Sequence, residues 1–525
     1  MPASGPLILI LLAATAPLAA AADLSEDIFK GALRYTVQIR TTLPVPFDGD
    51  RKGSGLGAGF VVDASRGWIM TNAHVVGRSP SRVEVALHGD EYSEASKVYV
   101  DPFLDLAIIQ VSERVETTGI AEPRLECEGM PPVGHPVGAF GHPWRLPFTG
   151  TRGIISGVTA RYRTELLQTD APINQGNSGG PLISLESGRI VGINTAGIRG
   201  AQNTNFAVAI KYACRVLQLL QEGKDPSPPD LKLVYYRDID NRKQLRVARS
   251  YAGDGTLKLL PGDVILQVVG ETGVIENETQ LLHALRGRLA NSSLKVVRDE
   301  HETIVSGTKL PMRRVLETRG VYASGVLFGP ITIRDALEIG ARGLMVHHVE
   351  PGSIGEAQEI EKSDLLEAVN GAPVLDVDAL HARLDEVRGT RQRVTLTFKK
   401  LAGGDALFSY TQRNLLVRDL RMIGPQIAAD QARSLTTPPA NPSPPLLSRV
   451  ERGGSRFPSS AWGKGMGWGL AGTPPRAGGE FISVNRSSCR RRSPVPGSCG
   501  SACCGRARAA ARPRSGGRRC GRGPS

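Results

Sequence analysis

The stretch INQGNSGGPL, Ile173–Leu182, sets one serine, Ser178, among three glycines: Gly176, Gly179 and Gly180. Glycine has no Cβ, so a chain rich in it can turn tightly and approach a ligand closely. A serine hydroxyl is a weak nucleophile until a base takes its proton, so this motif requires a histidine partner. The backbone N–H groups of Gly176 and Ser178 are suited to stabilising the negative oxygen of an attacked carbonyl. The stretch therefore predicts a nucleophilic serine with an oxyanion hole.

We predict that His74 is the base. It follows an apolar strand and stands in a turn of small residues, in GWIMTNAHVV (Gly67–Val76). Such a position suits a base that is held rigidly at the edge of a cleft. We expect surface or structural roles for the other eight histidines, which are His88, His135, His142, His283, His301, His347, His348 and His381.

A carboxylate should fix the tautomer of His74 and stabilise its charged form. The stretch DPFLDLAIIQV (Asp101–Val111) offers two candidates, Asp101 and Asp105. Asp105 immediately precedes the apolar run Leu106–Ile109, so it can stand at the start of a buried strand. Asp101 precedes a proline and fits a turn. We favour Asp105 as the third member of the triad.

The motif Gly176–Gly180 also fits the nucleophile elbow of an α/β-hydrolase, but its context excludes that fold. An elbow requires a parallel sheet and the chain order serine, acid, histidine, whereas His74 precedes Ser178. Short apolar or alternating runs bounded by turn residues predict an antiparallel sandwich or barrel instead. They are Tyr35–Ile39, Gly59–Val62, Trp68–Met70, Val83–Leu87, Leu106–Val111, Ile154–Val158 and Ile190–Asn194, followed by one helix at Tyr212–Gln221.

The motifs TNAHVV, DLAII and GNSGGP, in that order, resemble the HtrA/Deg (protease Do) family of trypsin-like serine proteases. The likeness covers roughly residues 30–220 and includes GAGFVVD, TRGIISG and VGINTA. It implies a mainly β, chymotrypsin-like double barrel with catalytic roles for His74, Asp105 and Ser178. It also implies a periplasmic or otherwise secreted protein, unfolded or damaged proteins as substrates, and a homotrimer.

Two positions near Ser178 differ from digestive trypsins. Pro172 stands six residues before the serine, where a basic-specific trypsin has an aspartate, so we expect a pocket around Pro172, Ala196 and Gly197 that accepts Val, Ala or Leu. Asn177 replaces the aspartate that receives a new N-terminus during zymogen activation. We therefore expect control by ordering of the loops at 144–151 and 196–204 rather than by proteolytic cutting.

Two related segments follow the protease-like part. Each has an aspartate before a buried strand, then a glycine turn, an amphipathic helix and a final strand, about 100 residues apart. They resemble the small α/β PDZ domains of the same family, which bind an extended peptide at a sheet edge. We expect the second to hold a peptide carboxylate at SGVLFG (Ser324–Gly329), through Gly325, Val326, Leu327 and Phe328, with the helix Asp378–Val387 as a wall. The first has no comparable loop.

The apolar run Leu7–Ala22 ends in three alanines and is followed by charged residues, which is typical of a secretory signal peptide; a short uncleaved anchor is the alternative. We expect no later membrane span. The expected organisation is a signal peptide at 1–22, a protease domain at 23–222, a linker at 223–231, PDZ-like domains at 232–312 and 313–402, an extension at 403–435 and a disordered tail at 436–525.

The excess of basic residues lies in the predicted tail. The chain has 64 Lys plus Arg against 51 Asp plus Glu, but residues 441–525 hold 16 of the basic and two of the acidic ones. The first 440 residues are left with 48 basic against 49 acidic, so we expect no nucleic-acid binding by the folded domains. The Pro-, Gly- and Arg-rich tail is a solvated segment, a contact for anionic surfaces, or not authentic coding sequence.

Only two of the seven cysteines, Cys127 and Cys214, precede the tail, so the folded part can form one disulfide at most. We find no G-x-x-x-x-G-K-[ST], Cys-x-x-Cys or H-E-x-x-H motif in the first 440 residues, and expect no cofactor, no metal and no use of ATP. The predicted function is that of a serine endopeptidase. The alternatives are a peptide-binding chaperone or scaffold with an inactive protease domain, and a serine esterase.

Overall fold

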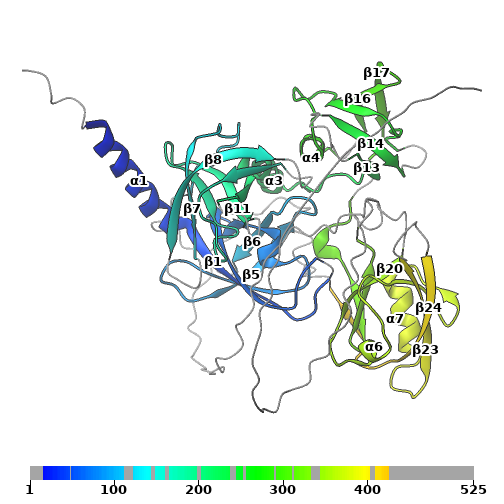
Figure 1. The fold of residues 1–525 in the computed structure, drawn as a ribbon. Coiled ribbons are helices and arrows are strands. Elements are labelled where there is room, and N and C mark those ends of the chain that lie inside the picture. The colour runs from blue at the N-terminus through cyan, green and yellow to red at the C-terminus, as the bar shows by residue number, and fades with distance from the viewer. Residues whose placement is uncertain are drawn as a thin grey trace, which may run out of the picture. The chain divides into compact units, whose positions relative to one another are not determined.

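A computed structural model describes the chain in the following ranges: 16–47, 49–111, 122–142, 148–159, 165–197, 203–236, 244–251, 256–288, 291–309, 312–332, 343–401 and 408–424. Figure 1 shows the arrangement of the elements. The predicted tail, 436–525, and the first part of the predicted signal peptide lie outside these residues.

The first barrel is closed by six antiparallel strands in the order β1-β2-β3-β6-β5-β4. Closing a sheet on itself leaves no edge with unpaired backbone groups, and the alternating side chains fill the interior. The strands are β1 (Thr36–Leu43), β2 (Gly53–Asp63), β3 (Trp68–Thr71), β4 (Arg82–Ala86), β5 (Ser93–Val100) and β6 (Ala107–Val111). One short helix, α2 (Ala73–Val76), directly follows β3.

The second barrel repeats this plan in the order β10-β11-β12-β9-β8-β7. Its strands are β7 (Pro136–Gly141), β8 (Thr149–Thr159), β9 (Leu166–Thr169), β10 (Pro181–Ser184), β11 (Ile190–Gly197) and β12 (Asn205–Ala209). The helix α3 (Ile210–Gln221) follows, and its apolar face is buried against the barrels. The two barrels confirm the predicted mainly β, chymotrypsin-like fold.

The N-terminal helix α1 (Ala16–Tyr35) packs against the second barrel through Phe29, whose ring lies 4.6 Å from that of Phe140 in an edge-to-face contact. This helix runs across the predicted signal-peptide cleavage site before Asp23. In the part of the chain that the structure describes, the helices are too short or too polar to cross a membrane.

A five-stranded sheet with one helix forms the first unit after the barrels. Its order is β13-β14-β15-β16-β17, and its core is formed by apolar residues of these strands and of α4. The elements are β13 (Leu233–Tyr235), β14 (Leu245–Ser250), β15 (Val264–Val268), α4 (Glu278–Leu285), β16 (Ser292–Arg298) and β17 (His301–Gly307). Asn277 caps α4 by accepting a hydrogen bond from the backbone N–H of Gln280.

The second unit continues past its predicted end at residue 402, because two later strands belong to the same sheet. Its main path is β24-β23-β21-β20-β19-β18-β25, and β22 pairs with β21. The elements are η2 (Val315–Glu317), β18 (Gly320–Ala323), β19 (Val326–Pro330), β20 (Leu344–Val349), α6 (Ile354–Ala357), β21 (Leu365–Val369), β22 (Ala372–Pro373), α7 (Val377–Asp385), β23 (Arg393–Leu401), β24 (Phe408–Leu416) and β25 (Arg421–Ile423).

Cys127 and Cys214 form a disulfide, which joins the segment before β7 to helix α3. The two cysteines are 87 residues apart in the sequence, so the disulfide closes a long loop and restricts the unfolded chain. The two cysteines that precede the tail are therefore paired with each other.

We expect that reduction with dithiothreitol lowers the free energy of unfolding of the protease part by about 2–4 kcal/mol, because the reduced unfolded chain gains loop entropy. Denaturant unfolding followed by intrinsic fluorescence, with and without reductant, measures the change. The Cys127→Ser/Cys214→Ser variant is the control, and its stability should not respond to reductant. An equal response in this variant would place the effect in the tail cysteines.

Candidate active site

The turn that carries Ser178 lies between β9 and β10, and backbone hydrogen bonds hold it from both barrels. The N–H of Ala58 on β2 donates to the carbonyl oxygen of Ser178 at 2.8 Å, and the N–H of Gly179 donates to that of Asn194 on β11 at 2.8 Å. Gly179 has φ of +86°, and a Cβ there would lie 2.1 Å from the carbonyl oxygen of Ala58. Only glycine fits this position, which explains one of the glycines of the motif.

The structure brings His74 and Asp105 into direct contact. Nδ1 of His74 lies 2.6 Å from Oδ2 of Asp105, and the backbone N–H of His74 donates to Oδ1 at 3.0 Å. His74 belongs to α2, directly after β3, and Asp105 belongs to the loop between β5 and β6. The two bonds to one carboxylate fix both the position of the imidazole and the nitrogen that faces the carboxylate.

Several groups stabilise the negative charge of Asp105. Burial alone would raise the pKa of its carboxyl, but the charge of His74 and the hydrogen bonds from His74 and Thr195 hold it well below its usual range. Asp105 is thus ionised at any pH at which the protein is expected to work. An ionised partner for the imidazole is what general-base catalysis by a histidine requires.

Thr195 is a site residue that the sequence analysis missed. Its Oγ1 donates to Oδ2 of Asp105 at 2.5 Å, and its carbonyl oxygen accepts a hydrogen bond from Oγ of Ser178 at 2.7 Å. One residue of β11 therefore connects the carboxylate of the first barrel to the serine of the second. The motif VGINTA marked the segment, but nothing in its residue pattern assigns a role to the threonine.

A close approach of three backbone segments shows that the histidine and serine turns converge. A Cβ on Gly57 would lie 2.6 Å from Cγ1 of Val75 and 3.1 Å from the carbonyl oxygen of Ser178. Val75 directly follows His74, so both turns lie against Gly57. In this arrangement Oγ of Ser178 donates a hydrogen bond to the carbonyl oxygen of Thr195.

Backbone hydrogen bonds fix the turn that contains the predicted oxyanion hole. Gly176 has φ of +105°, its carbonyl oxygen accepts from the N–H of His142 at 3.1 Å, and the N–H of Asn177 donates to the carbonyl oxygen of Asn174 at 2.9 Å. Within the described ranges, the N–H groups of Gly176 and Ser178 donate to no protein acceptor. Two free donors beside the serine hydroxyl are what an oxyanion hole needs, and the assignment stays a prediction.

Asn177 and His142 are buried behind this turn. Asn177 is 0% exposed, and in the part of the chain described here its side-chain amide has no hydrogen-bond partner. The ring of His142 accepts a hydrogen bond at Nδ1 from Nε2 of Gln38 at 2.9 Å, and within the same residues its Nε2 is buried without a partner. Burial, and to a lesser degree His88, lowers the pKa of His142 to about 4. His142 is therefore neutral at ordinary pH.

The residues predicted to form the specificity pocket lie on two segments. Pro172 is exposed, and its carbonyl oxygen accepts from Oγ1 of Thr151 at 2.9 Å. Ala196 and Gly197 form the end of β11, the strand that also carries Thr195. Most of the two loops predicted to control activity, at 144–151 and 196–204, lies outside the described residues. The pocket stays a prediction.

The structure gives a different setting to the four residues predicted to bind peptide. Ser324 and Gly325, both at positive φ, form a two-residue hairpin turn between β18 and β19. Val326, Leu327 and Phe328 are 0% exposed, and β19 pairs with β18 on one side and β20 on the other. A peptide cannot add to β19 in this arrangement because the strand has no open edge, and β25 covers the outer edge of β18.

Comparison with known proteins finds the following similarities. The model of the trypsin-like peptidase domain family matches residues 57–193. The chain is 30% identical over 370 residues to the probable periplasmic serine endoprotease DegP-like of Chlamydia trachomatis, in an alignment that covers 63% of this chain and 70% of that relative. It is 26% identical over 341 residues to the periplasmic pH-dependent serine endoprotease DegQ of Escherichia coli. That alignment covers 60% of this chain and 72% of that relative. A solved serine endoprotease from Yersinia pestis is 25% identical, with a TM-score of 0.41 over 55% of this chain and 98% of that one.

The barrels and the matched domain define a trypsin-like serine protease. More closely, the chain belongs to the HtrA/Deg family of serine endoproteases, as the motifs predicted. It is a periplasmic or otherwise secreted protein, as its relatives are.

The pKa of His142 predicts how stability depends on pH. The folded-state value of about 4 lies below the ordinary value of 6.5, so between these limits the unfolded chain binds a proton that the folded chain does not. Stability therefore falls as the pH falls from 6.5 to about 4, by about 3 kcal/mol at most from this residue. Urea unfolding at a series of pH values from about 4 to 7 measures the slope, which His142→Asn should reduce.

The pKa of His283, in α4, is also lowered to about 4, chiefly by burial, so it contributes a slope of the same sign. His283→Asn is a second test of the same effect. It should also reduce the slope, and the double variant should show the sum of the two reductions. An unchanged slope in the His142→Asn variant would contradict the prediction.

Proposed function

We propose that the chain is an ATP-independent endopeptidase that cuts unfolded or damaged proteins through an acyl-enzyme, with His74, Asp105 and Ser178 as the catalytic residues. The observation that carries the proposal is the pair of hydrogen bonds from His74 to the carboxylate of Asp105, joined through Thr195 to Ser178. Together they link a nucleophile, a base and an orienting acid across the two barrels.

The proposed reaction begins when Nε2 of His74 takes the proton of Ser178 and Oγ attacks the peptide carbonyl carbon. The negative oxygen is held by the N–H groups of Gly176 and Ser178, and Asp105 stabilises the imidazolium. His74 then gives its proton to the leaving amine, so the C–N bond breaks and an ester on Ser178 remains. Water, deprotonated by His74, attacks this ester. His74 then returns the proton to Oγ of Ser178 as the bond between Oγ and the acyl carbon breaks, which releases the acid.

The proposed substrates and assembly follow from the family. The relatives are named as periplasmic endoproteases, and resemblance to the family implies unfolded proteins as substrates and a homotrimer as the working form. The first 440 residues contain no phosphate-binding loop motif, and we propose that cleavage uses no ATP. Sedimentation velocity of the full chain tests the trimer.

We also propose that the pocket beside Pro172 selects Val, Ala or Leu, and that no activating cut is needed. A pocket without a buried anion gains nothing from a Lys or Arg side chain, whose charge would lose its hydration. Asn177 is neutral and lies within the core, so a new ammonium terminus would find no charge partner there.

Ser178→Ala should lower the rate of casein degradation by a factor of about 10⁴ or more, because no other group supplies the nucleophile. Release of acid-soluble fragments at elevated temperature measures the rate. Equal, near-zero rates for the wild-type chain and the variant would favour a chaperone or scaffold with an inactive protease domain. Activity on ester substrates alone would indicate an esterase.

Mapping of the cleavage sites in an unfolded protein tests the pocket. We expect Val, Ala or Leu before most of the cut bonds, and mass spectrometry of the fragments identifies them. Pro172→Asp should shift cleavage towards Lys and Arg, because the pocket then holds an anion. Dominant cleavage after Lys or Arg by the wild-type chain would contradict the proposed pocket.

A further inference from the structure

Arg286 directly follows α4 in the first PDZ-like unit, and it is buried against the first barrel. Its side chain is 2% exposed, and Nη2 lies 2.6 Å from Oδ2 of Asp101, which is 0% exposed. Nη1 donates to the hydroxyl of Tyr99 at 3.2 Å and to the carbonyl oxygen of Pro226 at 2.6 Å. Arg286 therefore connects the PDZ-like unit and the linker to the end of β5.

Asp101 in turn shapes the loop that carries Asp105. Its Oδ1 accepts the backbone N–H groups of Phe103 at 2.8 Å and Leu104 at 2.7 Å, and its own N–H donates to the carbonyl oxygen of Leu106 at 2.9 Å. These three bonds hold the backbone of the loop between β5 and β6 at Phe103, Leu104 and Leu106. Asp101 is thus the turn residue that its proline neighbour predicts, and its hydrogen bonds lie within the loop that carries Asp105.

The charge of Arg286 makes the burial of Asp101 possible. A buried carboxylate without a cation is strongly unfavourable, and breaking such a pair is far more harmful than breaking a surface pair. Burial alone would lower the pKa of Arg286, but Asp101 and the hydrogen bonds raise it above its ordinary value, so the guanidinium stays charged. Tyr99 completes the cluster by donating to Oδ2 of Asp101 at 2.9 Å.

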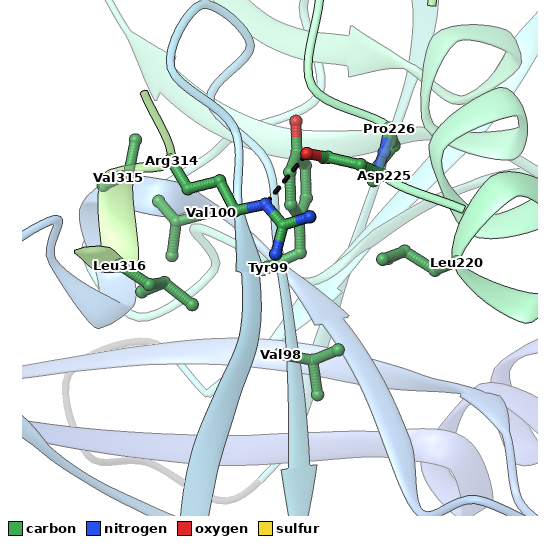
Figure 2. A pocket seen from close by; sticks show the side chains of 9 residues that line it. All are labelled: Val98, Tyr99, Val100, Leu220, Asp225, Pro226, Arg314, Val315 and Leu316. Atoms are coloured by element: carbon green, nitrogen blue, oxygen red, sulfur yellow. Dashed lines mark hydrogen bonds and ion pairs between the residues drawn. The ribbon is translucent and has the colours of Figure 1, made fainter. Parts of the chain in front are cut away.

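The connecting segments on both sides of the PDZ-like unit meet at the same place. Figure 2 shows Asp225 and Pro226 of the first connection and Arg314 of the second beside Tyr99. Nε of Arg314 donates to Oδ2 of Asp225 at 2.8 Å, and Leu316 of η2 is 4% exposed within the core of the barrels. Arg286 and both connecting segments therefore contact the protease at the end of β5.

We propose that Arg286 is a positioning residue of the protease: by pairing with Asp101 it holds the loop that presents Asp105 to His74. The inference rests on the proposed function, because Asp105 must act in catalysis for its position to affect the rate. A charge partner for the buried Asp101 carboxylate, rather than docking of the first PDZ-like unit as a whole, is then the condition for a well-formed triad. This role needs no peptide bound to that unit.

The other end of α4 supplies a matched control. Nε2 of Gln280 donates to Oε1 of Glu165 at 3.2 Å, in the segment just before β9. This contact also joins the PDZ-like unit to the protease, but it is remote in the chain from the loop of Asp105. Gln280→Ala therefore weakens docking without removing the partner of Asp101.

The experiment compares full-length chains of the wild type, Arg286→Met, Gln280→Ala and Asp101→Asn/Arg286→Met. Initial rates are measured on a short peptide anilide with Val before the cleaved bond, and labelling of Ser178 by a fluorophosphonate is followed in parallel. We expect kcat of Arg286→Met to fall at least tenfold with KM within twofold, and kcat of Gln280→Ala to stay within twofold. The double variant buries no unpaired charge, and the amide oxygen of the introduced asparagine still accepts the loop N–H groups, so its kcat should recover to within threefold of the wild type.

Unchanged kcat in folded Arg286→Met, an equal loss in Gln280→Ala, or no recovery in the double variant would overturn the proposal. If Arg286→Met does not fold, Arg286→Lys carries the test, because lysine keeps the charge but cannot also reach Tyr99 and Pro226. We then expect at least a threefold fall in kcat, and unchanged kcat overturns the proposal. A wild-type chain that neither cleaves nor labels would instead refute the proposed function.

Discussion

The site depends on one backbone contact between the two barrels. Ser178 and Gly179 are clamped from β2 and β11, and Gly179 leaves no room for a side chain between them. Since protein interiors are close-packed, even one extra methyl group at this point would separate the barrels or distort the turn. This close approach fixes the turn that carries the serine hydroxyl, whose Oγ donates to the carbonyl oxygen of Thr195.

The contact between His74 and Asp105 was predictable because it depends on residue type and order, while the catalytic roles stay predictions. Ser178 among glycines, His74 after an apolar strand and Asp105 before one are recognisable in the sequence, and the structure places Nδ1 of His74 2.6 Å from Oδ2 of Asp105. Thr195 was not predictable in this way, since a threonine in a strand usually contributes only to packing. Its role arises from the pairing of two barrels, which no local pattern describes.

Seven of the twelve barrel strands were predicted from apolar runs, whereas β5, β7, β9, β10 and β12 were not. Strand β5 shows why. Its sequence SEASKVYV contains a lysine, and Lys97 is buried because its ammonium donates to the carbonyl oxygens of Gly77 and Ser79. The setting of SGVLFG in the second PDZ-like sheet also differs from the expected one. Its glycine suggested a loop that binds a carboxylate through backbone N–H groups. The same residue types also suit the tight hairpin that is present, in which Ser324 and Gly325 both have positive φ. Arg286 had no distinguishing signal, because its partner Asp101 belongs to another domain.

The crosslink between Cys127 and Cys214 has a consequence for the life of the chain. Thiols stay reduced in the cytosol and form disulfides in exported proteins. The protease part is therefore less stable before export, without the disulfide, than after it. The substrates proposed for this chain are unfolded proteins, and newly made proteins in the cytosol belong to that class. Because the disulfide restricts the unfolded chain, its formation after export would raise the stability of the protease part.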